Sequence, residues 1–157
     1  FIKANFFMQN FEMYQQHDIR DKNQIFMPTG HGKAPFIHTR DIGHVVGEVI
    51  SAPEDFKNQT LYLTGPEAMD HFQAAEIFSE VLGKKIEYQN PDDDTYRREM
   101  KNRGYDDSYI DAMIAVFGKI KKGEVEQTSD TVVKILNRKP ITLKEYVTEK
   151  KDLFSGS

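Results

Sequence analysis

The stretch that says most about the fold covers residues 36–50 and reads FIHTRDIGHVVGEVI. Its first residues continue an apolar run, which predicts a β-strand over residues 34–38. From Thr39 onward the apolar residues recur at helical spacing, with Thr39 as the predicted N-cap and Asp41 in the first turn. We expect a helix here that ends before Pro53. Gly43 and Gly47 weaken its helix propensity, so close packing against another element is the expected compensation.

Strand and helix patterns alternate on both sides of this stretch. Strands are predicted over residues 1–3 (the end of a buried strand), 24–27, 60–64 and 85–88, and helices over 7–16, 70–82, 93–102, 107–121, 130–136 and from 142. The strand over 24–27 is expected to pair with that over 34–38 as a hairpin. Helices dominate after Pro91, which indicates an α/β fold with a mostly helical cap from Pro91 to Leu136. We expect one structural unit over residues 1–154 and a flexible tail over 155–157.

Composition limits the classes of function. The chain has 157 residues, 38% of them hydrophobic and 29% charged, which suits one globular domain. Its net charge of −4 argues against nucleic acid as a partner. Cysteine is absent, which excludes disulfides and thiolate chemistry and suits a cytoplasmic location. Because no apolar run approaches the ~20 residues that span a bilayer, we expect no membrane segment.

Three motifs suggest chemistry, and local context favours a structural role for each. Gly30-His31-Gly32-Lys33 resembles a phosphate-binding loop, but the residues that follow it read as strand, not helix. The five histidines show no metal-ligand spacing, so no metal site is expected, and His38 is better explained as a hydrogen-bonded structural residue. The acidic run Asp92-Asp93-Asp94 coincides with a predicted helix start, where carboxylates favour the helix dipole.

Four stretches together resemble the C-terminal half of NmrA-like proteins, an atypical branch of the short-chain dehydrogenase/reductase superfamily. These stretches are Asn5-Phe6-Phe7-Met8-Gln9-Asn10-Phe11, Phe36-Ile37-His38-Thr39-Arg40-Asp41-Ile42-Gly43, Leu61-Tyr62-Leu63-Thr64-Gly65-Pro66-Glu67-Ala68 and Asn137-Arg138-Lys139-Pro140-Ile141-Thr142. The resemblance covers nearly the whole chain. It departs at His38, where the family usually has Asp, at Asn137, where Gly is common, and at Ala4, where Pro or Gly is frequent.

The resemblance implies the C-terminal part of a Rossmann-like fold that binds NADP or NAD. The family's glycine-rich phosphate loop would precede Phe1, and Phe1 reads as a cut through a larger fold, so the main cofactor loop is expected to lie outside this chain. The resemblance places Phe6, Phe7, Met8 and Asn10 in the substrate site and Asn5 and Phe6 beside the cofactor. The alternative is that these aromatic residues belong to the core. Catalytic residues stay unassigned.

Three functions remain open at this point. The intact protein could be an NAD(P)H-dependent oxidoreductase that reduces a quinone-like or carbonyl small molecule. It could instead be a non-catalytic NAD(P)-sensing regulator that binds a protein partner. The chain alone could also be an inactive fragment whose uncovered sheet edge drives self-association into a homo-oligomer.

Overall fold

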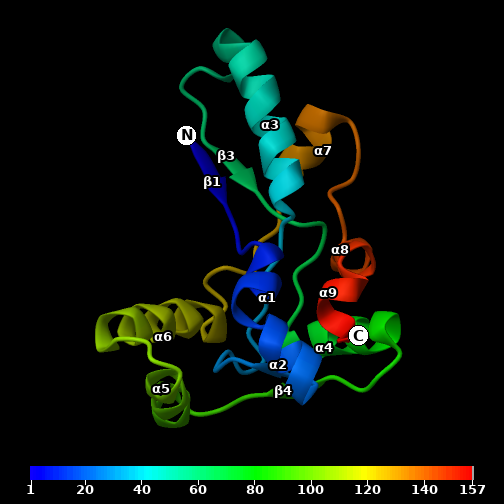
Figure 1. Ribbon diagram of the computed structural model, residues 1–157. Helices are drawn as coiled ribbons and strands as arrows, with labels where there is room; N and C mark the ends of the chain where they lie inside the picture. Colours follow the sequence, from blue (N-terminus) through cyan, green and yellow to red (C-terminus); the bar gives the residue numbers. More distant parts are fainter. Residues whose placement is uncertain (157) are drawn as a thin grey trace.

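The computed structural model describes residues 1–156 and confirms the expected mixture of strands and helices (Figure 1). The strands are β1 (Ile2–Ala4), β2 (Gln24–Phe26), β3 (Leu61–Leu63) and β4 (Glu87–Gln89). The helices are α1 (Gln9–Tyr14), α2 (Gln16–Lys22), α3 (Thr39–Ser51), α4 (His71–Leu82), α5 (Asp93–Asn102), α6 (Asp107–Lys121), α7 (Thr131–Leu136), α8 (Leu143–Glu149) and α9 (Lys151–Ser155), with a 3-10 helix at Pro53–Phe56.

The strands pair in parallel, in two separate pairs. β1 pairs with β3 in the register Ile2↔Leu61, and β2 pairs with β4 in the register Gln24↔Glu87. The hairpin expected between residues 24–27 and 34–38 is therefore wrong. The second of these segments makes only isolated bridges, Phe7↔Ile37 and Ala34↔Met69. A turn motif between two apolar runs suggested the hairpin, whereas both runs find their partners far away in the sequence.

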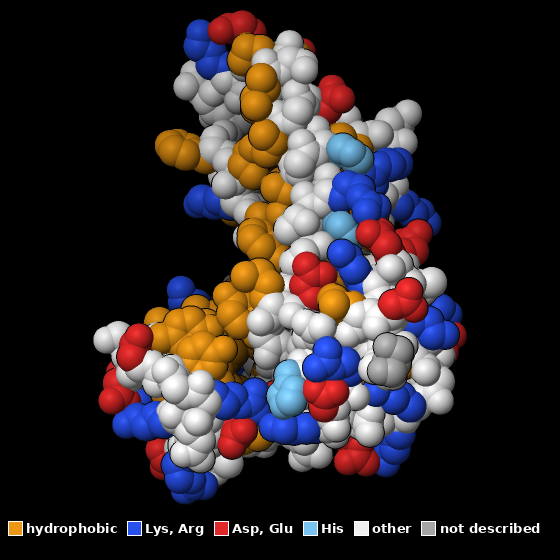
Figure 2. Space-filling model, in the orientation of Figure 1, with side chains coloured by type: hydrophobic (Ala, Val, Ile, Leu, Met, Phe, Trp, Pro, Cys, Tyr) orange, Lys and Arg blue, Asp and Glu red, His pale blue; other side chains and the backbone are white. Residues whose placement is uncertain are grey.

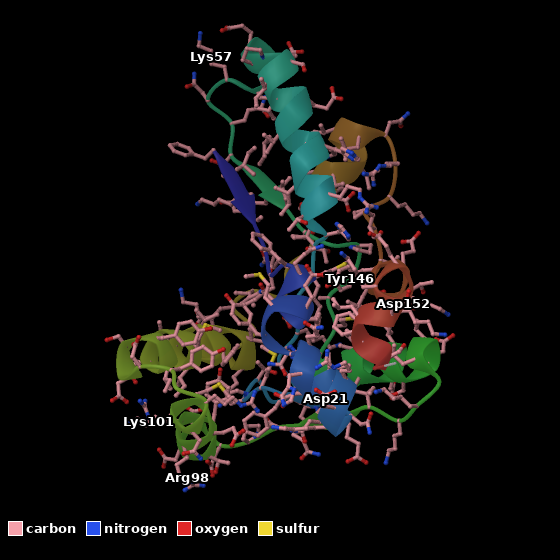
Figure 3. All side chains as sticks on the ribbon, in the orientation of Figure 1. Asp21, Lys57, Arg98, Lys101, Tyr146 and Asp152 are labelled. Atoms are coloured by element: carbon pink, nitrogen blue, oxygen red, sulfur yellow. The ribbon has the colours of Figure 1, made fainter. Side chains whose placement is uncertain are left out.

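Helices cover the two strand pairs separately. In the upper part of Figure 1, α3 and α7 pack on β1 and β3 around buried Ile37, Val45 and Leu63. Below it, α4, α8 and α9 enclose a second core that includes Phe78 and Tyr146. Figure 3 shows Tyr146 reaching from α8 toward α1, where its hydroxyl donates to the Glu12 carboxylate at 3.3 Å.

Helices α5 and α6 contact each other and project to one side of the molecule (Figure 1), and we call residues 93–121 the helical arm. Its own core contains Tyr96, Met100 and Phe117. The cap expected from Pro91 to Leu136 is thus smaller than predicted, because α7 packs on α3 and β3 instead. The arm is fixed to the body by Arg103, whose guanidinium donates to both carboxylate oxygens of buried Asp18 at 2.8 and 3.1 Å.

Several local expectations need correction. The N-cap of α3 is His38, not Thr39, because the His38 Nδ1 accepts a hydrogen bond from the Arg40 amide. A Cβ on Gly43 or Gly47 would meet no atom of the described residues within 4 Å, so close packing does not explain these glycines. Strand β1 is exposed rather than buried.

Ser155 belongs to α9, although residues 155–157 were expected to be a flexible tail, and Ser157 lies outside the described residues. No helix within residues 1–156 is long and apolar enough to cross a membrane.

Candidate functional site

The candidate site begins where β1 ends. The Asn5 amide donates to the Leu63 carbonyl at 2.9 Å, which continues the pairing of β1 with β3 by one residue. The Ile37 amide then donates to the Phe6 carbonyl at 2.8 Å, and the Met8 amide donates to the Ile37 carbonyl at 2.9 Å. After Asn5, the chain therefore stops pairing with β3 and pairs with the segment at Ile37 instead. Residues 5–10 lie at the carboxyl end of the parallel β1/β3 pair. Ligands of open α/β sheets bind at such ends.

A groove of about 370 Å³ opens at this place. It is lined by Ala4, Asn5, Phe6, Phe7, Asn10 and Val125. Figure 2 shows hydrophobic side chains running down this face and widening where α6 approaches α1, with the outline hollowed between β1 and α6. Phe7 remains 39% exposed, a large fraction for an aromatic side chain in the middle of a chain segment. The groove therefore offers an open aromatic wall to a ligand.

The structure brings four of the five predicted site residues together and separates the fifth. Asn5, Phe6, Phe7 and Asn10 all line the groove. Met8, which was also predicted for the substrate site, is only 1% exposed and packs in the core below, so it does not line the groove. Met8 already has helical backbone angles as the N-cap of α1, and its side chain packs among the buried residues of the core.

The two asparagines differ in what their amides do. Asn5 Nδ2 donates to the Val125 carbonyl at 3.0 Å, and Asn5 Oδ1 accepts from the Phe6 amide at 2.8 Å. Asn5 therefore fastens the loop after α6 to the end of β1. The half-buried Asn10 side chain makes no hydrogen bond to any described residue, so its amide is free to bind a ligand.

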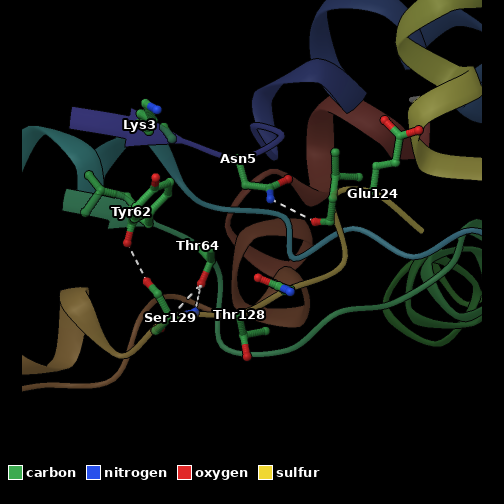
Figure 4. A pocket seen from close by; sticks show the side chains of 11 residues that line it. Lys3, Asn5, Tyr62, Thr64, Glu124, Thr128 and Ser129 are labelled. Atoms are coloured by element: carbon green, nitrogen blue, oxygen red, sulfur yellow. Dashed lines mark hydrogen bonds between the residues drawn. The ribbon is translucent and has the colours of Figure 1, made fainter. Parts of the chain in front are cut away.

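A second, more polar recess lies on the other side of Asn5 (Figure 4). Its volume is about 370 Å³, and Lys3, Thr64, Glu124, Thr128 and Ser129 contribute to its walls. The Ser129 amide donates to Thr64 Oγ1 at 2.9 Å, and the Ser129 hydroxyl donates to the Tyr62 carbonyl. These bonds hold the loop over residues 124–129 against β3.

The helical arm contributes aromatic residues that sequence reasoning did not assign to the site. Tyr105 and Tyr109 of the arm, together with Tyr14 of α1, line a small cavity beside the groove, and Tyr105 stacks on Tyr109 with ring centroids 4.9 Å apart. Burial raises the pKa of Tyr109 to about 12, so its hydroxyl stays protonated and neutral. Tyr105 precedes the N-cap of α6 and Tyr109 lies in its first turn, so the sequence shows that the two are near each other but not that they lie beside the groove.

The other candidate motifs have structural roles. A Cβ on Gly32 would lie 2.1 Å from the Ile120 carbonyl oxygen, so the Gly30-His31-Gly32-Lys33 turn uses its glycine to pack against α6. Asp92 caps α5 by accepting from the Thr95 amide at 2.7 Å, and that bond lowers the pKa of Asp92. Within the described chain, no three His, Cys, Asp or Glu side chains are grouped as a metal site would require.

Two of the four motifs quoted from the sequence, residues 36–43 and 137–142, contact each other in the structure. Asp41, fully buried at the start of α3, forms an ion pair with Arg138 at 2.6 Å through Oδ1. Its Oδ2 accepts from the Ile141 amide at 2.7 Å. The segment before α8 is therefore fastened to the N-terminus of α3. This contact joins the motif at residues 137–142 to an aspartate almost one hundred residues earlier in the sequence.

The comparisons with known proteins agree with this architecture. A sequence profile described as the NmrA-like family matches residues 1–147. An NAD(P)H azoreductase from Xenophilus azovorans is 32% identical over 146 residues, which cover 93% of this chain and 50% of that protein. An uncharacterized oxidoreductase, YesF, from Bacillus subtilis is 29% identical over 92% of this chain and 51% of that protein.

Solved structures share the fold. The Citrobacter sp. triphenylmethane reductase complexed with NADP(H) superposes with a TM-score of 0.82 at 23% identity, over 93% of this chain and 50% of that one. The Escherichia coli NADPH-dependent quinone oxidoreductase complexed with NADPH gives a TM-score of 0.80 at 21% identity, over 93% and 51%. The chain spans about half the length of the curated relatives it matches. On the profile match and the sequence identity together, the chain belongs to the NmrA-like family.

Proposed function

We propose that this chain forms the substrate-side portion of an NAD(P)H-dependent oxidoreductase that reduces a quinone-like or carbonyl small molecule. The observation that carries the proposal is the open aromatic groove at the carboxyl end of the parallel β1/β3 pair. A flat, uncharged ring can stack on Phe7 there, while the free Asn10 amide can donate to a carbonyl oxygen. Relatives named for the reduction of azo compounds, quinones and triphenylmethane dyes support the same class of substrate.

In our proposal, residues of this chain border the nicotinamide of a dinucleotide and do not bind its pyrophosphate. The turn over Gly30-His31-Gly32-Lys33 does not lead into a helix, and its second glycine is packed against α6, so it cannot hold a pyrophosphate. Asn5 and Phe6 border the groove where the nicotinamide would lie. When bound, the nicotinamide supplies a hydride. In our proposal, Phe7 orients the acceptor ring and Asn10 binds its carbonyl oxygen.

Substitution at Phe7 tests the substrate site. In the intact protein, Phe7→Ala is expected to raise the quinone KM about tenfold, the equivalent of ~1.4 kcal/mol of lost ring contact, with little change in NADPH affinity. Asn10→Ala is expected to act in the same direction. Phe72→Ala provides the matched control, because Phe72 is 40% exposed on α4 and lies outside the groove. Unchanged quinone kinetics in both groove variants would overturn the assignment.

A turnover assay separates this proposal from its alternatives. If the intact protein binds NADPH but oxidises it with no quinone, the regulatory function is the correct one. Calorimetric titration of NADPH into the 157-residue chain is expected to show no binding. Tight binding would mean that the chain holds a cofactor site of its own, and the proposed division of roles would fail. We also propose a cytoplasmic location, which suits the absence of cysteine.

A further inference from the structure

The groove continues into a small cavity between α1 and the helical arm. Phe6 and Asn10 line both spaces, so a ligand in the groove can extend past them into the cavity. Tyr96, Met100 and Phe117 form its floor and are all buried in the core of the arm. Figure 3 shows Arg98 and Lys101 pointing away from the body of the molecule. The side of the arm that lines the cavity carries aromatic and methionine side chains instead.

The cavity has no unpaired charge to offer a ligand. Arg103 contributes to its wall, but its guanidinium binds both Asp18 oxygens and also donates to Glu99 at 2.9 Å. Tyr109, with its pKa raised to about 12, is neutral. A charged group placed in the cavity would lose its hydration without gaining a partner, so the occupant has to be uncharged.

The volume of the cavity limits further which groups can occupy it. The cavity measures about 50 Å³, whereas an engineered apolar cavity that binds benzene is about 150 Å³. A complete ring therefore does not fit without movement of the arm. A methyl, a methoxy or another group of a few heavy atoms does fit. The adjoining groove, at about 370 Å³, is large enough for the ring itself.

We propose that the cavity is a size-selective subsite that takes one short, uncharged substituent of the aromatic ring bound in the groove. This inference rests on the proposed function for the identity of the ring and adds which part of the substrate is selected. Met113 is the lining residue best suited to a test of the size of the subsite. It lines the cavity from α6 and is half-buried, so truncating it enlarges the space without removing a fully buried core residue such as Met100.

A pair of quinones with the same ring, one carrying a methyl and the other a butyl group, tests the subsite. In the intact protein, Met113→Ala is expected to raise the ratio of kcat/KM for the butyl over the methyl quinone at least tenfold, because each misfitting methylene costs about tenfold or more. Met113→Phe, which narrows the cavity, is expected to lower kcat/KM for the methyl quinone relative to the unsubstituted ring. Met13→Ala on α1 is the matched control, since Met13 is 66% exposed and lies outside both spaces.

The outcomes distinguish this subsite from the function it rests on. A ratio unchanged in both Met113 variants, at wild-type melting temperature, overturns the subsite and leaves the reductase intact. If the intact protein reduces no quinone, the proposed function fails, and calorimetry with the same two quinones on the 157-residue chain then tests the subsite directly. There, a Met113→Ala shift in the ratio of the two Kd values supports it, and an unchanged ratio or no binding of either quinone overturns it.

Discussion

His71 lies in a fully enclosed aromatic environment. Phe11, Phe36 and Tyr88 surround its ring, and its Nδ1 lies 2.8 Å from Thr29 Oγ1. Burial lowers the pKa of His71 to about 4. The unfolded chain therefore binds a proton on this histidine between about pH 6.5 and pH 4, where the folded chain does not. The stability that neutral His71 provides is complete above pH 6.5 and is lost as the pH falls toward 4.

This difference in proton binding predicts that the free energy of unfolding falls measurably as the pH is lowered. Over that pH range, wild type is expected to lose about 3 kcal/mol more of its unfolding free energy than His71→Gln, by 1.36 kcal/mol per unit of pKa difference. Urea denaturation at a series of pH values measures the difference. His31→Gln controls for the loss of an imidazole at the surface, because the His31 side chain is 84% exposed. Parallel profiles for wild type and His71→Gln would show that His71 takes up a proton as readily in the folded chain as in the unfolded one.

Gly65 shows how a single residue can be required by a distant segment. A Cβ at this position would lie 1.9 Å from the Phe36 carbonyl oxygen, so Gly65→Ala has to displace backbone. We expect Gly65→Ala to cost at least ~3 kcal/mol, the upper range for overpacking. Gly43→Ala, the matched substitution in an uncrowded helix, is expected to stabilise by up to ~1 kcal/mol. Thermal unfolding of both variants checks the contrast, and equal melting temperatures would contradict it.

At the scale of single elements, the features that sequence predicts well are those encoded by neighbouring residues. The capping boxes Asp70/Gln73 and Thr142/Glu145, at the starts of two predicted helices, are of this kind, because each needs only residues three apart. Helix α2 was missed because its segment is mostly polar. The break before it depends on Gln15, whose side chain bonds the Phe26 backbone at 3.0 and 3.4 Å. Such a contact has no local signal.

The same distinction applies to the candidate site. Phe6, Phe7 and Asn10 could be predicted to lie together because they follow one strand within one motif, and they line one groove. Tyr105 and Tyr109 approach them only after the arm folds back from almost one hundred residues away, so sequence spacing could not place them there. Met8 belongs to the same motif but is buried, because a motif does not tell which side chains point inward.

The attachment of the arm to the body predicts an effect on a whole element. Arg103→Ala leaves the buried Asp18 carboxylate with Lys22 as its remaining cationic partner, and we expect a cost of about 3 kcal/mol. Amide hydrogen exchange in residues 93–121 is expected to accelerate more than that in α4. Arg98→Ala is the control, because Arg98 is bonded only to Thr95 of its own helix among the described residues. Equal protection of the arm in both variants would show that its attachment does not depend on the Asp18 pair.

For the molecule as a whole, the β1/β3 pair leaves one strand edge uncovered. Within residues 1–156, β1 pairs with β3 and with no second strand, and Phe1 and Ile2 are exposed beside it. An open apolar edge pairs readily with another copy. Ile2→Lys is therefore expected to shift the 157-residue chain toward monomer in sedimentation at high concentration. Ile50→Lys on α3, at a residue 72% exposed, adds the same charge away from the edge and should leave association unchanged. A wild-type chain that sediments as a monomer throughout would show that the edge does not drive self-association.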